Sequence, residues 1–234
     1  MNREDLEKLL KTLVDLNDEQ LKQYFDYYNI LVEQSKVMNL TTIKSLEGVY
    51  IKHFYDCLLL SKSVDLTKNI TLCDIGSGAG FPGIVLKIAF PNLQITLVEP
   101  TLKRCKFLQL VIDSLDLDGI EVVNDRAEKY INNKRESYDL VTARAVASFN
   151  ILSELCVPFL KINGIFAALK GSNYDEELDE SAECFKKLGI NKPEIHSFNL
   201  PNESGYRAIL VSKKVKKTPM LYPRDYAKIK KNPL

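Results

Sequence analysis

The segment with the clearest chemical potential is glycine-rich: Asp74-Ile75-Gly76-Ser77-Gly78-Ala79-Gly80-Phe81-Pro82-Gly83. It lies between an apolar stretch at residues 70–75 and a second apolar stretch with helical spacing, which predicts a strand, a turn and a helix. Because its glycines carry no side chains, such a turn lets a nucleotide-like cofactor touch the main chain at the carboxyl ends of parallel strands. A tight structural turn is the alternative. The expected cofactor-binding residues of the turn are Asp74, Gly76, Gly78 and Gly80.

Glu99 follows the next apolar stretch and lies 23 positions after Gly76. An acidic side chain about 20 residues beyond the first glycine is expected to hold the ribose hydroxyls of a bound nucleotide. An acidic cap on the helix that begins near Leu102 is the alternative interpretation. Both dinucleotides and S-adenosylmethionine are cofactors of this geometry, so Glu99 does not separate them.

Further polar residues lie where later strands are expected to end. Arg126-Ala127-Glu128 could present a backbone N–H and a carboxylate to an adenine ring, although a helix capped by Asp125 explains the same residues equally well. Arg144 is expected to place a positive charge at the edge of the sheet where ligands bind. A surface salt bridge is the alternative interpretation. His53 and Asp56 share a helix face and could form an acid–base pair, but packing or capping is the more common role of such a histidine.

The elements that must position these residues alternate in type. Residues 1–62 predict helices only, including a capping box from Asn17 to Gln20 and a helix over 45–60. From residue 70 onward, strands alternate with helices, which indicates βαβ units and a parallel sheet. The expected strands are 70–75, 94–99, 120–124, 138–143 and 164–169, and the expected helices are 83–90, 102–115, 127–132, 149–160 and 175–188.

Residues 194–200 and 206–213 are separated by a short turn and predict an antiparallel hairpin. A dinucleotide fold would continue with parallel strands, so the hairpin favours S-adenosylmethionine. We therefore expect an α/β, Rossmann-like class I methyltransferase fold with a seven-stranded, mostly parallel sheet. Its expected parts are an N-terminal helical extension (1–62), a cofactor-binding core (63–213) and a basic C-terminal tail (214–234).

The composition limits the remaining function classes. The chain has 234 residues with 45% hydrophobic content, and no apolar stretch approaches the ~20 residues of a membrane span. The N-terminus lacks the pattern of a secretory signal, so we expect a cytoplasmic protein. Five widely spaced cysteines and two histidines without ligand spacing predict neither disulfides nor a metal site. Eight basic residues between Lys213 and Lys231, against Asp225 alone, suggest phosphate binding or a disordered lysine-rich end.

Several segments together resemble the RsmG (GidB) family of bacterial methyltransferases, which methylate N7 of a guanine in 16S ribosomal RNA. They are Asn39-Leu40-Thr41, His53-Phe54-Tyr55-Asp56, the glycine-rich turn, Asp125-Arg126-Ala127-Glu128, Thr142-Ala143-Arg144-Ala145-Val146-Ala147, Leu221-Tyr222-Pro223-Arg224 and Lys231-Asn232-Pro233-Leu234. The resemblance implies cofactor contact by Gly76, Phe81, Ala127, Glu128 and Arg144, with Glu99 at the ribose. It also implies S-adenosylmethionine as cofactor and 16S ribosomal RNA or the small subunit as partner. We expect a monomer.

Methylation of guanine N7 would not require a general base, because this nitrogen carries a lone pair and no proton. An arginine bound to O6 and N7 together would occupy that lone pair. Arg144 is therefore expected to contact O6 alone, a phosphate or the cofactor, while Phe81 or Phe149 stacks on the base. Three rival hypotheses are an NAD-dependent oxidoreductase with the same turn, a non-enzymatic RNA-binding protein with a vestigial pocket, and a small-molecule N-methyltransferase with the same fold.

Overall fold

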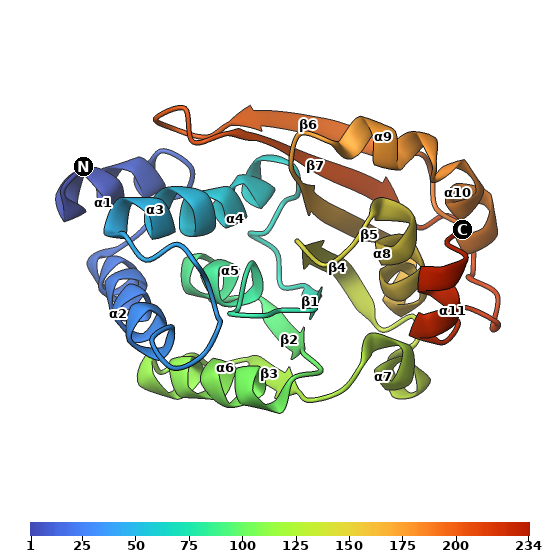
Figure 1. The fold of residues 1–234 in the computed structure, drawn as a ribbon, viewed down its shortest axis with the longest axis horizontal. Coiled ribbons are helices and arrows are strands. Elements are labelled where there is room, and N and C mark those ends of the chain that lie inside the picture. The colour runs from blue at the N-terminus through green and yellow to red at the C-terminus, as the bar shows by residue number, and fades with distance from the viewer.

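The computed structural model describes all residues, Met1–Leu234, as one sheet with helices on both faces (Figure 1). The strands are β1 (Thr71–Ile75), β2 (Gln94–Val98), β3 (Ile120–Val123), β4 (Tyr138–Arg144), β5 (Leu160–Lys170), β6 (Glu194–Asn199) and β7 (Tyr206–Lys213). The helices are α1 (Arg3–Lys11), α2 (Asp18–Gln34), α3 (Leu46–Val49), α4 (Asp56–Leu58), α5 (Gly83–Ala89), α6 (Leu102–Ser114), α7 (Ala127–Lys134), α8 (Phe149–Cys156), α9 (Tyr174–Asp179), α10 (Ala182–Leu188) and α11 (Tyr226–Lys231). Shorter helical segments are η1 (Tyr50–Tyr55), η2 (Leu59–Lys62) and η3 (Val157–Phe159).

The seven strands lie in the order β3-β2-β1-β4-β5-β7-β6. Strands β1 to β5 pair in parallel, whereas β7 pairs antiparallel with both β5 and β6. The predicted mostly parallel sheet with a C-terminal antiparallel hairpin is thus confirmed. The strand order reverses between β1 and β4, and ligands of open α/β sheets bind at the carboxyl ends of strands beside such a reversal.

Both faces of the sheet are buried under helices. Successive strand residues point to opposite faces, so Leu72 belongs to the apolar cluster that includes residues of α1 to α6, while its neighbour Cys73 belongs to the cluster that includes residues of α7 to α11. The two groups of helices lie on opposite faces of the sheet (Figure 1). The N-terminal helices share the first of these cores. Gln20 completes the predicted capping box with Asn17, and its side chain also donates to the carbonyl of Ile88 in α5, 2.7 Å away. This contact docks α2 against the helix that follows the glycine turn.

Three expected helices differ in detail. The helix expected over 45–60 is helical from Leu46 to Lys62, but its central part, η1, has π-helical geometry. The helix expected over 149–160 ends at Cys156, because Pro158 has no N–H to continue it. The single helix expected over 175–188 is wrong: α9 and α10 are separate. The buried Ser181 hydroxyl donates to the Glu177 carbonyl and competes with the helical hydrogen bond there.

All five cysteines are buried and unpaired. No three His, Cys, Asp or Glu side chains gather in a way that could hold a metal ion. None of the helices combines the length and the apolar character that crossing a membrane would need.

Gly83 allows α5 to lie directly against β1 and β2. A Cβ atom there would lie 2.2 Å from Cδ2 of Leu97 and 2.9 Å from Oδ2 of Asp74. We expect Gly83→Ala to destabilise the protein by about 1–3 kcal/mol through overpacking, measured by urea unfolding. Gly171→Ala is the matched control, since a Cβ there meets nothing within 4 Å. Equal unfolding free energies for the two variants would contradict this account of the turn.

Candidate active site

The glycine turn presents bare main chain at the carboxyl end of β1. Gly76, Gly78 and Gly80 have φ angles of +72°, +59° and +90°, a region that side chains disfavour. A Cβ atom at Gly78 would meet only the Gly76 carbonyl oxygen, at 3.8 Å, so the space beside this residue is open. The turn therefore offers its main chain to a ligand at the strand-order reversal.

The carboxylate of Glu99 lies against this turn. In the register of β1 and β2, Ile75 is opposite Val98, so the residues that follow each strand are neighbours. Glu99 Oε2 accepts from the Gly78 N–H at 3.0 Å, and Oε1 accepts from the Thr101 N–H at 2.9 Å. The side chain therefore meets both the turn and the start of α6. Because an ionised carboxylate has about four acceptor positions, Glu99 keeps acceptor capacity for hydroxyl groups.

A mostly apolar hollow of about 180 Å³ adjoins Gly76. Of the predicted residues, Ala127 and Glu128 line it beside Gly76, at the start of α7. Its other walls come from β1, β2 and the loop that follows it, the residue before α7, the loop after β4, α8 and α11: Ile75, Val98, Pro100, Arg126, Val146, Leu155 and Tyr226. An apolar slot with few polar groups at its edge suits a purine ring.

Asp74 lies behind the turn and is completely buried. One oxygen, Oδ2, accepts from the Gly83 N–H at 3.0 Å, while Oδ1 has no hydrogen-bond partner. Burial raises the pKa of this carboxyl to about 7. The open main chain at Gly78, the carboxylate of Glu99 and the neighbouring apolar slot fit a cofactor that contains a purine and a ribose.

Arg144, at the end of β4, is the centre of a buried polar cluster with η1 and α4. Its Nε donates to Asp56 at 3.0 Å, and its Nη2 donates to the Lys52 carbonyl at 2.7 Å and to Nδ1 of His53 at 3.2 Å. Since arginine can only donate, Nδ1 of His53 accepts and Nε2–H donates to Thr41 Oγ1 at 2.9 Å. Burial, aided by the charge of Arg144, lowers the pKa of His53 to about 3, so the ring is neutral.

His53 and Asp56 do not form the acid–base pair that was the alternative to a packing role: both side chains bind Arg144 instead. The ring of His53 also stacks on Phe81, with centroids 4.5 Å apart. Phe149 is fully buried between Phe166 and Phe185, so it has no face for a nucleobase and that part of the expectation is corrected.

A second hollow, of about 300 Å³, lies on the other side of the loop after β4. Ala145 lines this hollow, while the next residue, Val146, lines the apolar one. Three cations face it, Arg144, Lys170 and Arg207, together with the carboxylates of Asp56 and Glu177. Arg207 binds Asp56 at 3.1 Å and Lys170 binds Glu177 at 2.5 Å. This arrangement suits a polar, hydrogen-bonding group of a substrate.

The predicted residues thus divide among three places. Gly76, Ala127 and Glu128 line the apolar hollow, and Gly78 and Glu99 bind each other beside it. Gly80 faces the N-terminal helices, since a Cβ there would lie 2.7 Å from the Tyr27 hydroxyl. Phe81 and Arg144 belong to the polar cluster, with the guanidinium carbon 5.6 Å from the ring centroid.

Several residues at these hollows were not predicted as site residues, and Tyr226 and Arg207 are the two that lie farthest along the chain from the turn. Tyr226 comes from the C-terminal tail and Arg207 from β7, far along the chain from the turn. No local spacing places them there. The only available signal was that β7 lies beside β5 in the expected hairpin and that the tail carries aromatic residues.

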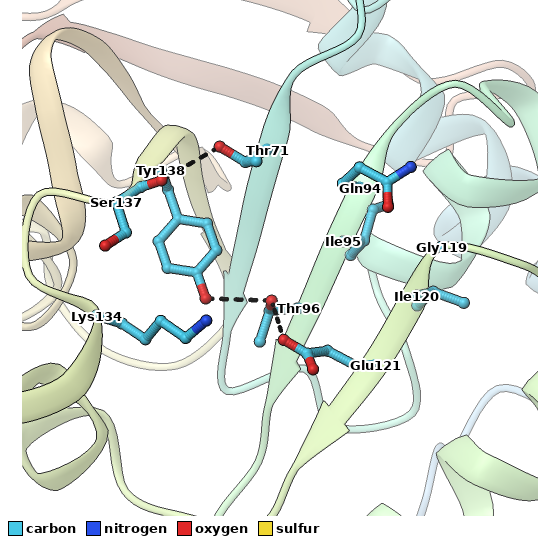
Figure 2. A pocket seen from close by; sticks show the side chains of 10 residues that line it. All are labelled: Thr71, Gln94, Ile95, Thr96, Gly119, Ile120, Glu121, Lys134, Ser137 and Tyr138. Atoms are coloured by element: carbon cyan, nitrogen blue, oxygen red, sulfur yellow. Dashed lines mark hydrogen bonds between the residues drawn. The ribbon is translucent and has the colours of Figure 1, made fainter.

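A polar hollow of about 390 Å³ lies at the opposite edge of the sheet, among the first residues of β1 to β4 (Figure 2). It contains a chain of hydrogen bonds in which the Tyr138 hydroxyl bonds Thr96 Oγ1 at 3.1 Å and Thr96 donates to Glu121 at 2.9 Å (Figure 2). None of the predicted site residues reaches it. Because ligands of open parallel sheets bind at the carboxyl ends of the strands, this hollow is not the candidate site.

Comparison with known proteins gives a consistent family. Residues 19–205 match the GidB family model, described as rRNA small subunit methyltransferase G. The chain is 45% identical to the Ribosomal RNA small subunit methyltransferase G of Staphylococcus carnosus, over 98% of this chain and 97% of that protein. It is 46% identical to the protein of the same name from Bacillus velezensis, over 100% of this chain and 99% of that one.

Solved structures share the fold at low sequence identity. A SAM dependent methyltransferase from Aquifex aeolicus superposes with a TM-score of 0.56 at 16% identity, covering 79% of this chain and 98% of its own. Fibrillarin from Aeropyrum pernix, solved with bound S-adenosyl-L-methionine, gives 0.51 at 15% identity, covering 64% of this chain and 68% of its own. The fold is therefore that of class I methyltransferases.

The raised pKa of Asp74 predicts a pH dependence of stability. The folded state holds the Asp74 proton up to about pH 7, whereas the unfolded chain releases it near 3.8, so this contribution to stability is lost as pH rises between the two values. Asp74→Asn removes the titration. The unfolding free energy of the variant relative to wild type should rise with pH from 4 to 7, by at most about 1.4 kcal/mol per pH unit.

Asp65→Asn is the control, because the pKa shift of Asp65, and with it the pH dependence of its contribution to stability, has the opposite sign. Hydrogen bonds from Thr67 lower the pKa of this exposed carboxyl to about 2. Wild-type Asp65 therefore contributes stability above its unfolded pKa and loses it as pH falls. A pH-independent difference between Asp74→Asn and wild type in denaturant titrations would contradict the raised pKa.

Proposed function

The chain belongs to the rRNA small subunit methyltransferase G family, and from that membership we propose that it methylates N7 of a guanine in 16S ribosomal RNA with S-adenosylmethionine as methyl donor. The observation that carries the proposal is the contact between the Gly78 N–H and the Glu99 carboxylate, 3.0 Å apart, beside an apolar hollow. This combination supports a nucleoside cofactor at the strand-order reversal.

The residues of the site have distinct roles in this proposal. Glu99 would accept from the ribose hydroxyls, Gly78 would leave room for the cofactor against the main chain, and Gly76 would line the apolar hollow beside it. Ala127 and Glu128 would flank the adenine at the start of α7. Asp74, Gly80 and Phe81 would hold the turn in place from behind. When bound, S-adenosylmethionine supplies an electrophilic methyl group on its sulfonium.

Guanine N7 attacks with an in-plane lone pair, so this chain does not need to remove a proton from the nucleophile. The protonation state of the polar cluster agrees with that requirement. His53 is neutral, and its Nδ1 lone pair already accepts from Arg144. We propose that the protein acts by alignment, which can lower a barrier by up to about 7–11 kcal/mol in favourable cases.

The hollow lined by Arg144, Lys170 and Arg207 is the proposed substrate side of the site. Nε and Nη2 of Arg144 are occupied by Asp56, Lys52 and His53, which leaves Nη1 to donate to a ligand. A single donor suits guanine O6 or a phosphate oxygen and leaves N7 free for methyl transfer. Arg144 therefore has a positioning role in the proposal.

The C-terminal tail is the proposed RNA-contacting segment. Two of its basic residues serve the fold instead: Lys214 is fully buried against the carbonyls of Val157 and Leu160, and Arg224 binds the buried Glu154. The exposed Lys228, Lys230 and Lys231 of α11 can neutralise phosphates. We propose functional parts at 1–62, 63–213 and 214–234 in a cytoplasmic enzyme that acts as a monomer without a metal.

Two other functions remain distinguishable by experiment. An NAD-dependent oxidoreductase would use the same turn, but the family and the antiparallel strand β7 do not favour it. A non-enzymatic RNA-binding protein would bind S-adenosylmethionine without methyl transfer. Isothermal titration with S-adenosylmethionine and NAD distinguishes the oxidoreductase from the methyltransferase. An assay of methyl transfer to RNA distinguishes the non-enzymatic protein from the methyltransferase.

Incubation with methyl-labelled S-adenosylmethionine and 16S ribosomal RNA from a strain that lacks the enzyme should label the RNA. Nuclease digestion and mass spectrometry should then identify 7-methylguanosine at one site. Glu99→Gln is the control, because it weakens acceptance from the ribose hydroxyls without changing side-chain size. Label at another atom of the base would contradict the N7 assignment, and no label despite cofactor binding would favour the non-enzymatic alternative.

Arg144→Ala should lower kcat for methyl transfer by about 100-fold, since loss of alignment near the reacting atoms has effects of this size. Arg144→Lys should not restore turnover, because an ammonium cannot reach Asp56 and His53 together in the planar geometry of the guanidinium. Lys161→Ala, which removes a half-exposed pair with Asp139, is the control. Wild-type turnover in both Arg144 variants would remove this residue from the mechanism.

A further inference from the structure

The C-terminal segment after Thr218 is packed on the core although it contains only one short helix. Tyr222 and Ile229 are buried in the apolar cluster that also contains Leu155 and Phe149 of α8. The Thr218 hydroxyl donates to the Leu188 carbonyl at 2.8 Å. The segment therefore has a defined position relative to α8 and α10.

One ion pair fixes this segment to α8. Glu154 is fully buried, and its carboxylate accepts from Nε and the backbone N–H of Arg224, both at 2.8 Å, and from Nη2 at 2.6 Å. Nη2 also donates to the Asn232 carbonyl, 3.1 Å away. A bidentate contact of this kind restrains both distance and orientation. The ion pair thus sets where α11 begins, two residues after Arg224.

Tyr226, the first residue of α11, lines the apolar hollow together with Gly76 and Val98. Leu155, which follows Glu154 in α8, lines the same hollow. The guanidinium carbon of Arg126 lies 5.9 Å from the centroid of the Tyr226 ring, so the phenol ring sits at the start of α7 as well. The ion pair and the aromatic wall are therefore adjacent both along α8 and along the tail.

We propose that Tyr226 is a cofactor-binding residue that closes the adenine end of the hollow, and that Arg224, held by Glu154, is the positioning residue for it. This inference rests on the proposed use of S-adenosylmethionine. A partly exposed aromatic ring beside a slot of Ile75, Val98 and Leu155 offers a purine a flat apolar face. The cofactor site is then assembled from the turn near residue 76 and from the last ten residues of the chain.

The test measures the Kd of S-adenosylhomocysteine by isothermal titration, without RNA and without turnover. Loss of base–aromatic stacking should raise the Kd of Tyr226→Ala by about 5- to 150-fold. Tyr226→Phe keeps the ring and should bind as wild type does. Thermal unfolding establishes that each variant is folded, and Tyr226→Leu replaces the alanine variant if the latter is not.

Arg224→Gln tests the positioning role through a double-mutant cycle. If Arg224 acts through Tyr226, then Arg224→Gln weakens binding alone but adds less than twofold in the presence of Tyr226→Ala. Arg224→Lys, which keeps the charge but loses the bidentate contact, replaces it if the glutamine variant does not fold. Additive effects, or no effect of Arg224→Gln alone, would overturn the positioning role.

The outcomes separate this inference from the proposed function. A Kd for Tyr226→Ala within twofold of wild type, with wild-type binding intact, overturns the role of Tyr226 and leaves the methyltransferase assignment standing. A wild-type protein that binds neither S-adenosylhomocysteine nor S-adenosylmethionine overturns both. Weaker binding in Tyr226→Ala with recovery in Tyr226→Phe supports the inference.

Discussion

The register between β1 and β2 is the constraint on which the rest of the site depends. It sets Ile75 opposite Val98, so the glycine turn and Glu99 leave the sheet side by side and the Gly78 N–H can donate to the carboxylate. A shift by one residue would turn Glu99 to the other side of the strand. Gly83, whose missing Cβ lets α5 lie against Leu97, allows the helix after the turn to pack closely on these two strands.

The electrostatics of the site follow from burial. Arg144 is a buried cation, and Asp56 compensates it while also binding Arg207. His53 contributes no charge, because protonation would place a second cation against Arg144 in a poorly solvated place. The cluster therefore holds the end of β4 rigidly and does not offer a titratable base. This agrees with a reaction in which the nucleophile already has its lone pair.

Sequence patterns predicted the fold well because its signals are local. Alternating strands and helices, the capping box at Asn17 and the hairpin each depend on residues within one element or one turn. The break between α9 and α10 was missed, because the cause is a single buried serine inside a stretch of good helix formers. The end of α8 was also placed too late, although Pro158 is a local signal in the sequence for the end of a helix.

The site was predictable only where the strand order alone brings residues together. Glu99 and the turn belong to adjacent parallel strands, so their proximity follows from the fold. The partners of Arg144 are different: Asp56 is 88 residues away on a helix before the sheet. Spacing along the chain contains no information on such pairs, since they depend on how helices dock on the finished sheet. The same holds for Tyr226.

The helices before β1 complete the site physically and share one core with the sheet. The Tyr27 hydroxyl donates to the Ala79 carbonyl inside the glycine turn, and the Lys52 carbonyl accepts from Arg144. η1 carries Lys52 and His53, and its π-helical turn is of a kind often found at functional sites. The turn is thus supported by α2 from behind and the end of β4 by η1. The helix α2 thus supports the proposed cofactor side and η1 supports the proposed substrate side. Displacement of the N-terminal helices would therefore disturb the two sides together.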